Sequence, residues 1–395
     1  MTICHTLQTA ARGSSWTIAA IRRAFSSPAL PAGSSAGTLE IRSCRELTPA
    51  KFPEYVAATP TNLHNMIWRS PLQNVYVVKK PWNARVRDAM VQFIDHIHHE
   101  YAAVNIIVSE DVADELAQEW KGSGRRVVYT GPIGEIVART DLVVTMGGDG
   151  TILRAVSAFS SVGVPPVLSF SMGTLGFLLP FDFSTFKHSF RQVYESRAKA
   201  LHRHRLECYV KRTDSDTNRA LEGVVGPEKV IHAMNDITLH RGSQPHLTSL
   251  DIFIDHELLT TTTCDGVVIS TPTGSTAYSL SAGGSIAHPL VPCILLTPIC
   301  PRSLLFRPLV LPVTSHVSVR LSEENRNRLI KLTIDGIAQR SLRPGDEICV
   351  SNPEHELVKL ELAGAPGIWC VARTENDWTN DINEMLGFNS SFGKV

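Results

Sequence analysis

The sequence predicts two domains of different class, an α/β domain followed by an antiparallel β domain. From Asn74 to about residue 200, short apolar segments alternate with helical segments, which is typical of a parallel sheet covered on both faces by helices. After about Leu201 short strands follow one another with hardly any helix between them, which predicts a β-sandwich. The length of 395 residues is enough for two such cores.

In the first domain the expected strands are short apolar runs, and the expected helices are the longer segments between them. We predict strands at 75–78, 104–108, 127–130, 142–146 and 166–170, and helices at 84–101, 112–120, 151–159 and 184–196. Ligands of such sheets bind at the carboxyl ends of the strands, which directs attention to the turn after Met146.

The second domain shows strands bounded by turn residues. We predict strands at 206–211, 230–240, 249–254, 266–270, 317–321, 329–334, 347–350 and 358–362. The polar stretch 213–218 is expected to be a solvated loop.

Composition narrows the class of partner. Lys plus Arg and Asp plus Glu both number 38, so neither nucleic acid nor an anionic membrane is expected, and a small-molecule substrate is the better expectation. The eight cysteines include no Cys-x-x-Cys pair, which fits free thiols in a reducing compartment. No apolar run approaches the length that spans a bilayer.

The N-terminal segment has the composition of a mitochondrial presequence. Its first 39 residues contain Arg12, Arg22 and Arg23, many Ser, Thr and Ala, and no acid before Glu40. We therefore expect residues 1–45 to be a presequence and disordered leader, and the protein to reach the mitochondrial matrix. A disordered cytosolic tail is the alternative.

The turn Gly147-Gly148-Asp149-Gly150-Thr151 is the strongest candidate for chemistry. A glycine-containing strand-to-helix turn presents bare backbone N–H groups and the positive end of a helix dipole to a phosphate. A carboxylate repels phosphate, so Asp149 is better explained as a metal ligand or as a base that takes a proton from an attacking hydroxyl. An ordinary α/β connection is the alternative from this pentapeptide alone.

Two further strings carry polar side chains in unusual density. The stretch 271–284, TPTGSTAYSLSAGG, can bond phosphate or ribose, and Tyr278 can pack on a base or nicotinamide ring. In the stretch 235–242, NDITLHRG, the side chains of Asn235 and Asp236 can hold the two hydroxyls of a ribose. A solvated Ser/Thr turn and an Asn-Asp turn dipeptide are the respective alternatives. Neither a P-loop nor a Gly-x-Gly-x-x-Gly string occurs.

Taken together, these strings and the stretch 173–178, GTLGFL, resemble the NAD kinase family, and within it the fungal mitochondrial NADH kinases. The resemblance runs from about Pro71 to the C-terminus and includes Thr374-Glu375-Asn376-Asp377-Trp378. It implies a Rossmann-like α/β domain at 70–200, a dinucleotide-binding β-sandwich at 201–365, and a C-terminal segment, 366–395, that returns to the first domain. A homo-oligomer is also expected.

The resemblance further implies the reaction and the residues that serve it. The expected activity is ATP- and Mg²⁺-dependent phosphorylation of the adenosine ribose 2′-hydroxyl of NADH and NAD⁺, with no metal ligand identified. Asp149 would accept the proton, and Asn235 and Asp236 would hold a ribose. Asp265 would lie near the nicotinamide. The other residues expected to bind nucleotide are Gly147, Gly148, Gly150, Thr276, Ala277, Tyr278 and Ser281, with Thr273, His246, Arg154 and Phe177 as neighbours.

Two rival functions and one point of specificity stay open. Lipid kinases of the diacylglycerol or sphingosine type share a GGDGT turn but would require an apolar acceptor pocket, and a non-catalytic dinucleotide sensor would bind without transfer. Arg302 stands where many family members have histidine, so its charge is expected to disfavour the cationic nicotinamide of NAD⁺. A surface arginine without such a role is the alternative.

Overall fold

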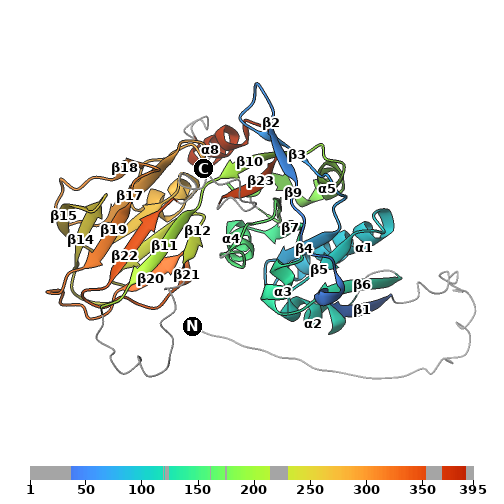
Figure 1. Cartoon of the computed structure of the whole chain (residues 1–395), viewed down its shortest axis with the longest axis horizontal. Coiled ribbons are helices and arrows are strands. Elements are labelled where there is room, and N and C mark those ends of the chain that lie inside the picture. Colours follow the sequence, from blue (N-terminus) through green and yellow to red (C-terminus); the bar gives the residue numbers. More distant parts are fainter. Residues whose placement is uncertain are drawn as a thin grey trace, which may run out of the picture.

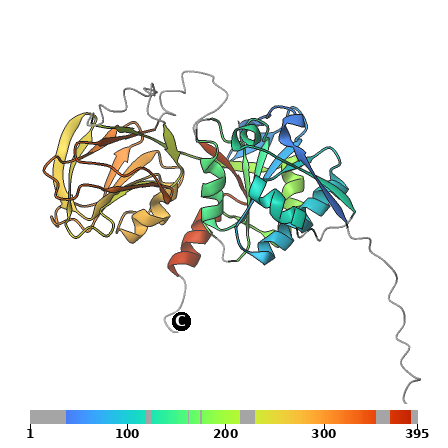
Figure 2. The ribbon, with the colours of Figure 1, turned by 90° about the horizontal axis from the view of Figure 1, so that it is seen from below.

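The computed structural model describes residues 37–118, 120, 124–160, 162–173, 176–213, 230–352 and 367–387. It consists of two lobes, with helices α4 (Asp149–Ser157) and α8 (Asp377–Leu386) at their junction (Figures 1 and 2). The predicted fold class is confirmed, because a largely parallel α/β domain precedes two antiparallel sheets. The predicted strand at 358–362, the leader up to residue 36 and the loop from residue 214 lie outside the described residues.

The first domain is organised around one large sheet with the strand order β1-β6-β5-β4-β7-β8-β23-β10-β3-β2, and β9 pairs with β8. Neighbours from β1 to β23 are parallel, whereas β10, β3 and β2 are antiparallel. The strands are β1 (Thr38–Ser43), β2 (Glu54–Ala57), β3 (His64–Ile67), β4 (Asn74–Lys79), β5 (Asn105–Ile107), β6 (Arg125–Thr130), β7 (Leu142–Gly147), β8 (Val167–Ser171), β9 (Phe181–Asp182), β10 (Lys199–Arg203) and β23 (Ile368–Ala372).

Helices bury both faces of this sheet, since the central strands are apolar on both sides. Val75 and Val77 of β4 belong to the core cluster with α1, α2 and α5, whereas Tyr76 and Val78 belong to the cluster with α3 and α4. The helical elements are η1 (Cys44–Glu46), α1 (Ala84–Glu100), α2 (Glu110–Gln118), α3 (Ile133–Val137), η2 (Phe183–Thr185), α5 (Phe186–Tyr194) and the two junction helices named above. None of the helices in the described part is long and apolar enough to cross a bilayer.

The sheet begins earlier than predicted. Residues 38–43, expected to be part of the leader, form β1 and pair in parallel with β6, while β2 and β3 extend the opposite edge before residue 70. These strands escaped prediction because each is only four to six residues long and none contains a continuous buried apolar run.

The second domain is a sandwich of two six-stranded antiparallel sheets. One sheet has the order β12 (Ile231–Ala233), β11 (Leu206–Lys211), β22 (Glu347–Ser351), β19 (Val317–Leu321), β14 (Thr248–Ile254) and β15 (Glu257–Cys264). The other has the order β18 (Leu309–Pro312), β17 (Cys293–Ile299), β16 (Gly266–Ser270), β13 (Asp236–His240), β20 (Lys331–Ile334) and β21 (Ile337–Ala338). Their inner faces share one apolar cluster, which includes Leu250, Ile269 and Val319.

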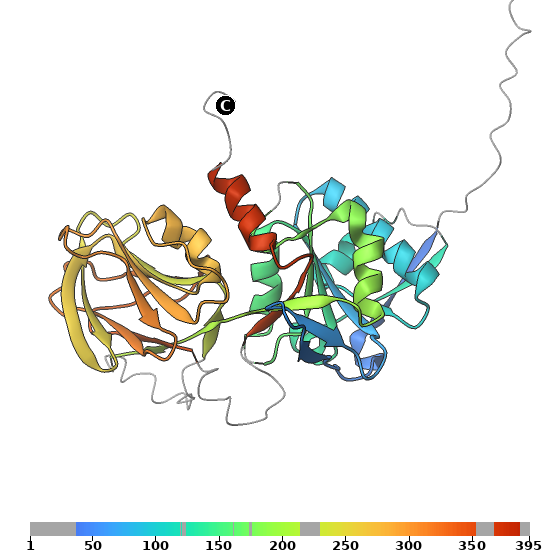
Figure 3. The same ribbon diagram turned by 90° about the horizontal axis from the view of Figure 1, so that it is seen from above.

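The predicted single strand at 230–240 is in fact two strands in different sheets. The chain leaves β12 at Ala233 and enters β13 at Asp236. Between them, Met234 is fully buried in the first domain's cluster that contains Ile152 and Leu178. The break therefore anchors the sandwich on α4, which lies between the two lobes in Figure 3, and Asn235 directly follows the anchoring residue Met234.

Candidate functional site

The GGDGT turn lies in the middle of the large sheet, at the carboxyl end of β7. Strand β4 precedes β5 and β6 on one side of this point, and β7 and β8 lie on the other side, so the strand order reverses here. Such a reversal leaves a crevice outside the strand ends, where ligands of open α/β sheets bind. Helix α4 begins at Asp149, and its N-cap residue Gly148 makes no side-chain capping bond, so backbone N–H groups are left for a ligand.

The glycines of this turn fall into two groups. A β-carbon at Gly147 would lie 3.0 Å from Lys80 Cβ and 3.2 Å from Thr151 Cβ, so internal packing requires glycine there. In contrast, a β-carbon at Gly148 or Gly150 would meet no atom within 4 Å. Gly148 also has φ −121° and ψ −176°, which any residue adopts. Space for an approaching ligand is the physical reason that remains for these two glycines.

The carboxylate of Asp149 points toward the loop that follows β8. Leu178 N donates to Asp149 Oδ1 at 3.3 Å, and a β-carbon at Gly176 would lie 2.9 Å from Asp149 Cγ. Burial raises the pKa of Asp149, and the N–H groups of Leu178 and Phe177 and the charge of Arg203 offset only part of this rise. The carboxylate of Asp149 thus lies against the segment from Gly176 to Leu178, which forms a wall of the site, and its affinity for a proton is raised.

Arg203 joins the two halves of the site, although sequence reasoning did not select it. From the end of β10, its Nη1 donates to Thr273 Oγ1 at 3.2 Å and its Nη2 donates to Phe177 O at 3.1 Å. Phe177 belongs to the wall beside Asp149, and Thr273 begins η4 (Thr273–Thr276) in the sandwich domain. The signal in the sequence was only the alternating His-Arg run at 202–205, which does not reveal such distant partners.

Asn235 and Asp236 are held at the start of β13 by a third acidic residue. Asp335 accepts the backbone N–H groups of Met234 at 2.8 Å, Asn235 at 2.7 Å and Asp236 at 3.2 Å. Asn235 Oδ1 is buried without a hydrogen-bond partner in the described structure. Burial raises the pKa of Asp236, whose Oδ1 accepts the Thr238 hydroxyl at 3.0 Å. An unpaired buried amide oxygen is costly, so Asn235 is poised for a ligand donor such as a hydroxyl.

The loop that contains η4 and α6 (Tyr278–Ser281) packs directly on Asn235. A β-carbon at Gly274 would lie 2.5 Å from the carbonyl carbon of Asn235, and Thr271 N donates to Asn235 O at 2.9 Å. Thr276 and Ala277 are half-buried, Ser281 is exposed, and Tyr278 is 41% exposed. Burial, together with nearby Cys300, Asp236 and Asp265, raises the pKa of Tyr278.

Two of the predicted residues are not brought into this group. His246 is exposed in the loop before β14, and its carbonyl oxygen accepts Asn327 Nδ2 at 2.7 Å. Arg154 lies 3.9 Å from Asp111 Oδ2 through its Nη2, on the β5 side of α4, whereas Asp149 faces the loop after β8. A further predicted residue, Asp265, lies in the sandwich domain, where its carboxylate accepts a hydrogen bond from Arg241 Nε at 2.5 Å.

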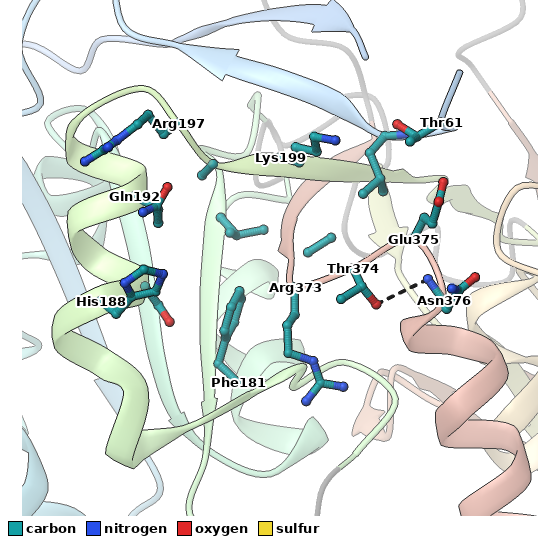
Figure 4. Close-up of a pocket in the computed structure, with 15 residues that line it drawn as sticks. Thr61, Phe181, His188, Gln192, Arg197, Lys199, Arg373, Thr374, Glu375 and Asn376 are labelled. Atoms are coloured by element: carbon teal, nitrogen blue, oxygen red, sulfur yellow. Dashed lines mark hydrogen bonds between the residues drawn. The ribbon is translucent and has the colours of Figure 1, made fainter. Parts of the chain in front are cut away.

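A separate cavity of about 510 Å³ lies between α5, β10 and the start of α8 (Figure 4). Arg197, Lys199 and Arg373 stand around it, and Phe181 forms part of its wall. None of the predicted site residues lines this cavity.

Comparison with known proteins identifies the family. The N-terminal domain model of ATP-NAD kinases matches residues 82–198, and the C-terminal domain model matches residues 234–361. The mitochondrial NADH kinase of Saccharomyces cerevisiae is 51% identical over 381 residues, which cover 90% of each chain. The chain belongs to the NAD kinase family. The mitochondrial NADH kinase of Schizosaccharomyces pombe is 38% identical over 84% of this chain and 79% of its own.

Solved structures agree with this assignment. The crystal structure of yeast NADH kinase complexed with NADH has a TM-score of 0.81 and 52% identity, covering 90% of this chain and 99% of that chain. An NAD kinase from Archaeoglobus fulgidus, solved in complex with ATP, has a TM-score of 0.54 at 19% identity and shares the fold. These likenesses show the NAD kinase fold, and the GGDGT turn lies within the residues that the N-terminal family model matches.

Proposed function

We propose that this NAD kinase uses ATP to phosphorylate the adenosine ribose 2′-hydroxyl of NADH, and of NAD⁺, and that it does so in the mitochondrial matrix. The observation that carries the proposal is the convergence at the domain junction. Asp149 lies at the free N-terminus of α4, and Arg203 connects its wall to the polar loop that packs on Asn235. The high identity to two mitochondrial NADH kinases supports both the acceptor and the compartment.

Each side chain then has a defined task. Asn235 Oδ1 and the carboxylate of Asp236 accept hydrogen bonds from ribose hydroxyls, and Tyr278 packs against a ring of the dinucleotide. Asp149 accepts the proton of the 2′-hydroxyl as that oxygen attacks the γ-phosphorus, and the bond from phosphorus to the ADP oxygen breaks. The backbone N–H groups at the start of α4 stabilise charge on the transferring phosphate. Positioning and electrostatics supply most of the catalysis in such reactions.

Mg²⁺ is part of the proposal through its association with ATP. Mg²⁺ usually binds through one or two carboxylates together with substrate phosphates. The carboxylates of Asp149 and Asp236 are the side chains in this site whose donor chemistry fits that role. When bound, Mg²⁺ neutralises charge on the phosphates. Across the described ranges, no group of three or more His, Cys, Asp or Glu side chains is arranged to hold a metal alone.

One assay tests the reaction directly. The purified chain is incubated with Mg-ATP and either NADH or NAD⁺, and the 2′-phosphorylated product is quantified, with Asp149→Asn as the matched control. We expect product from the wild-type chain and a large loss in the variant. Absence of product from both dinucleotides would overturn the proposal.

The compartment and the assembly state need separate measurements. Imaging should show a fluorescent fusion in mitochondria, and a fusion that lacks residues 1–39 should lose that location. We also propose a homo-oligomer, which is supported by the exposed side chains of Leu258, Leu304 and Leu305 on the sandwich domain. If light scattering gives the mass of a monomer across the range of protein concentrations used in the assay, the proposed homo-oligomer is contradicted.

A further inference from the structure

The cavity of about 510 Å³ between α5, β10 and the start of α8 is distinct from the catalytic turn (Figure 4). Strand β23 runs parallel to β8, which is parallel to β7, so the chain leaves β23 on the same edge of the sheet as the GGDGT turn. Strand β10 is nevertheless three positions from β7, or about 14 Å at the usual strand spacing. Ala198 and Val371 of the cavity belong to the core cluster on the α5 face, whereas α4 packs on the opposite face. This cavity is therefore available to a second ligand.

Segments that are far apart in the sequence form the walls of this cavity. His188 and Gln192 lie four residues apart on α5 and so share one face of the helix, and their side chains project from α5 toward the cavity in Figure 4. The other walls come from the turn into β10, the end of β23 with the segment after it, and the loop between β2 and β3, namely residues 197–199, 371–376, Thr61 and Leu63. The ring of Phe181 adds an apolar surface. A cavity of this volume suits a small organic molecule.

The lining carries an excess of positive charge. Its lysine and arginine side chains are Arg197, Lys199 and Arg373, whereas Glu375 is its single acid. Because Lys plus Arg and Asp plus Glu both number 38 over the whole chain, this excess is a local feature. Cationic side chains around one cavity are suited to bind phosphate and carboxylate groups through charge-assisted hydrogen bonds.

Two of these cations keep N–H donors for a ligand. Lys199 forms no ion pair with any residue that the structure describes, and the residues beside it in the sheet, Ala372 and Asn65, are neutral. Arg373 Nε donates to Asp377 Oδ1 at 3.3 Å, whereas its two Nη atoms have no hydrogen-bond partner in the described ranges. A guanidinium carries five N–H donors, so this pair leaves most of them for a ligand.

The third cation, Arg197, is only partly neutralised by its neighbours. Its Nη2 is paired with Glu195 Oε2, but Oε1 of the same carboxylate accepts Arg191 Nε at 2.8 Å. One acid thus serves two guanidinium groups. Glu375, the acid of the lining, is exposed and forms no ion pair with a described residue. The positive charge at the cavity therefore exceeds the negative charge around it.

We propose that this cavity binds a small organic anion with two or more phosphate or carboxylate groups, and that this anion is an effector of the enzyme. Arg197, Lys199 and Arg373 bind its charged groups. Gln192 donates to a further oxygen, since its side-chain amide has no partner among the described residues. Phe181 contacts the carbon frame of the anion.

The effector role follows from a wall that two cavities share. Residues 374–376 line this cavity and also a neighbouring cavity of about 260 Å³, which is bordered by Phe177 and Leu178. Leu178 N donates to Asp149 Oδ1, so the second cavity borders the wall beside the catalytic carboxylate. An anion held by Arg373 restrains residues 374–376 and thereby biases the position of this wall. The effector role rests on the proposed kinase function, whereas the binding site does not.

Calorimetry on the full chain tests the site with two probes, fructose bisphosphate for the phosphate class and tricarballylate for the carboxylate class. We expect at least one probe to bind, and its affinity should fall about fivefold in Lys199→Gln and in Arg197→Gln, the size of a lost ion pair at an exposed site. Glu375→Gln removes the opposing charge and should strengthen binding. Lys187→Gln changes an exposed lysine of α5 outside the lining and is the matched control, which should bind as the wild-type chain does. Binding of neither probe, or equal binding by wild type and Lys199→Gln, would overturn the site.

Kinetics at saturating Mg-ATP and NADH test the effector role. The probe that binds should change kcat at least about twofold, and Lys199→Gln should require an about fivefold higher probe concentration for the same effect. A probe that competes at the catalytic turn would instead raise the KM for ATP and lose its effect at saturating ATP, which would overturn the effector role. An unchanged kcat with the probe bound would overturn that role as well and leave the binding site intact. Absence of product from the wild-type chain without any probe would contradict the kinase function itself.

Discussion

Asp149 and Asp335 are both half-buried aspartates beside glycine, one at the turn that begins α4 and the other at the turn after β20. Burial raises the pKa of each, to about 6 for Asp335. Their surroundings nevertheless differ. Asp335 accepts three backbone N–H groups from the segment Met234–Asp236. Within the described residues Asp149 accepts one hydrogen bond, from Leu178 N at 3.3 Å, and the adjacent glycines Gly148 and Gly150 have open space.

The comparison shows that burial and a raised pKa do not by themselves identify a catalytic acid or base. Asp335 uses its lone pairs to hold Asn235 and Asp236 in place, so we infer that it positions the acceptor side of the site. Asp149 keeps lone pairs free beside unoccupied N–H groups, which suits proton transfer to or from a ligand. The predictions below test this division between a reacting and a positioning carboxylate.

Replacement of the reacting carboxylate is expected to have the largest effect. Asp149→Asn should lower kcat by about 10² to 10⁴, the usual contribution of a general base, with little change in the unfolding transition. Because the pKa of Asp149 is raised, wild-type kcat/KM should begin to fall on acidification above the pH range usual for a carboxylate. The residual activity of the variant should lack this acidic limb. A variant with near-normal kcat would refute the assigned role.

Removal of the positioning carboxylate should act mainly on stability. Asp335→Ala leaves three backbone N–H groups without their acceptor, and we expect the free energy of unfolding to fall by about 3 kcal/mol or more. Asp335→Asn keeps one acceptor oxygen and should lose less. Chemical denaturation, with the KM for NADH measured on the folded fraction, distinguishes the two variants from wild type.

The pH dependence of stability gives a second test of Asp335. Burial raises its pKa from 3.8, the ordinary value for an exposed aspartate, to about 6, so the folded chain binds this proton more tightly than the unfolded chain does. The resulting stabilisation is complete below about pH 4 and is lost as the pH rises through about 6. Asp335→Asn should lack this component of the slope. An unchanged slope between about pH 4 and pH 6 would contradict the raised pKa.

Replacement of two glycines by alanine should distinguish a glycine that leaves space for a ligand from one that is required by packing within the protein. Gly148→Ala adds a methyl group that meets no protein atom, so stability should change by less than about 0.5 kcal/mol while the KM for ATP rises or kcat falls about tenfold. Gly176→Ala forces a methyl group against the Asp149 carboxylate and should impair both activity and stability. Wild-type kinetics in Gly148→Ala would remove the argument that a phosphate approaches this turn.

The two carboxylates also differ in how visible they are in the sequence. Asp149 could be predicted because the apolar strand, the glycines and the helix that define its turn are adjacent along the chain. The bonds of Asp335 connect residues about 100 positions apart, and those of Arg203 to Thr273 span 70, so no local pattern reveals them. Similarly, β17 was hidden by Pro298. The return of the C-terminal segment to the first domain was expected only from the family resemblance, because β23 pairs with β8 and β10, which are far away in the sequence.

The smallest effect is expected at Arg302, outside the two carboxylates. Its charge should affect the choice between NADH and NAD⁺ but not the rate of phosphoryl transfer. Its backbone N–H donates to Thr263 O at 2.8 Å, close in sequence to Asp265, which is already paired with Arg241. We expect its positive charge to act on the end of the dinucleotide that carries nicotinamide. Since the side chain is exposed, screening limits its repulsion of NAD⁺ to about 1 kcal/mol.

The ratio of kcat/KM for NADH to that for NAD⁺ measures this effect. Arg302→His, assayed at about pH 8 where histidine is neutral, should lower the ratio about fivefold, whereas Arg302→Lys should preserve it because the charge remains. Neither change should alter the acidic limb set by Asp149. If Arg302→His keeps the wild-type ratio, the arginine is a surface residue without a part in selectivity. If both variants lower the ratio equally, the shape of the guanidinium rather than its charge selects the reduced dinucleotide.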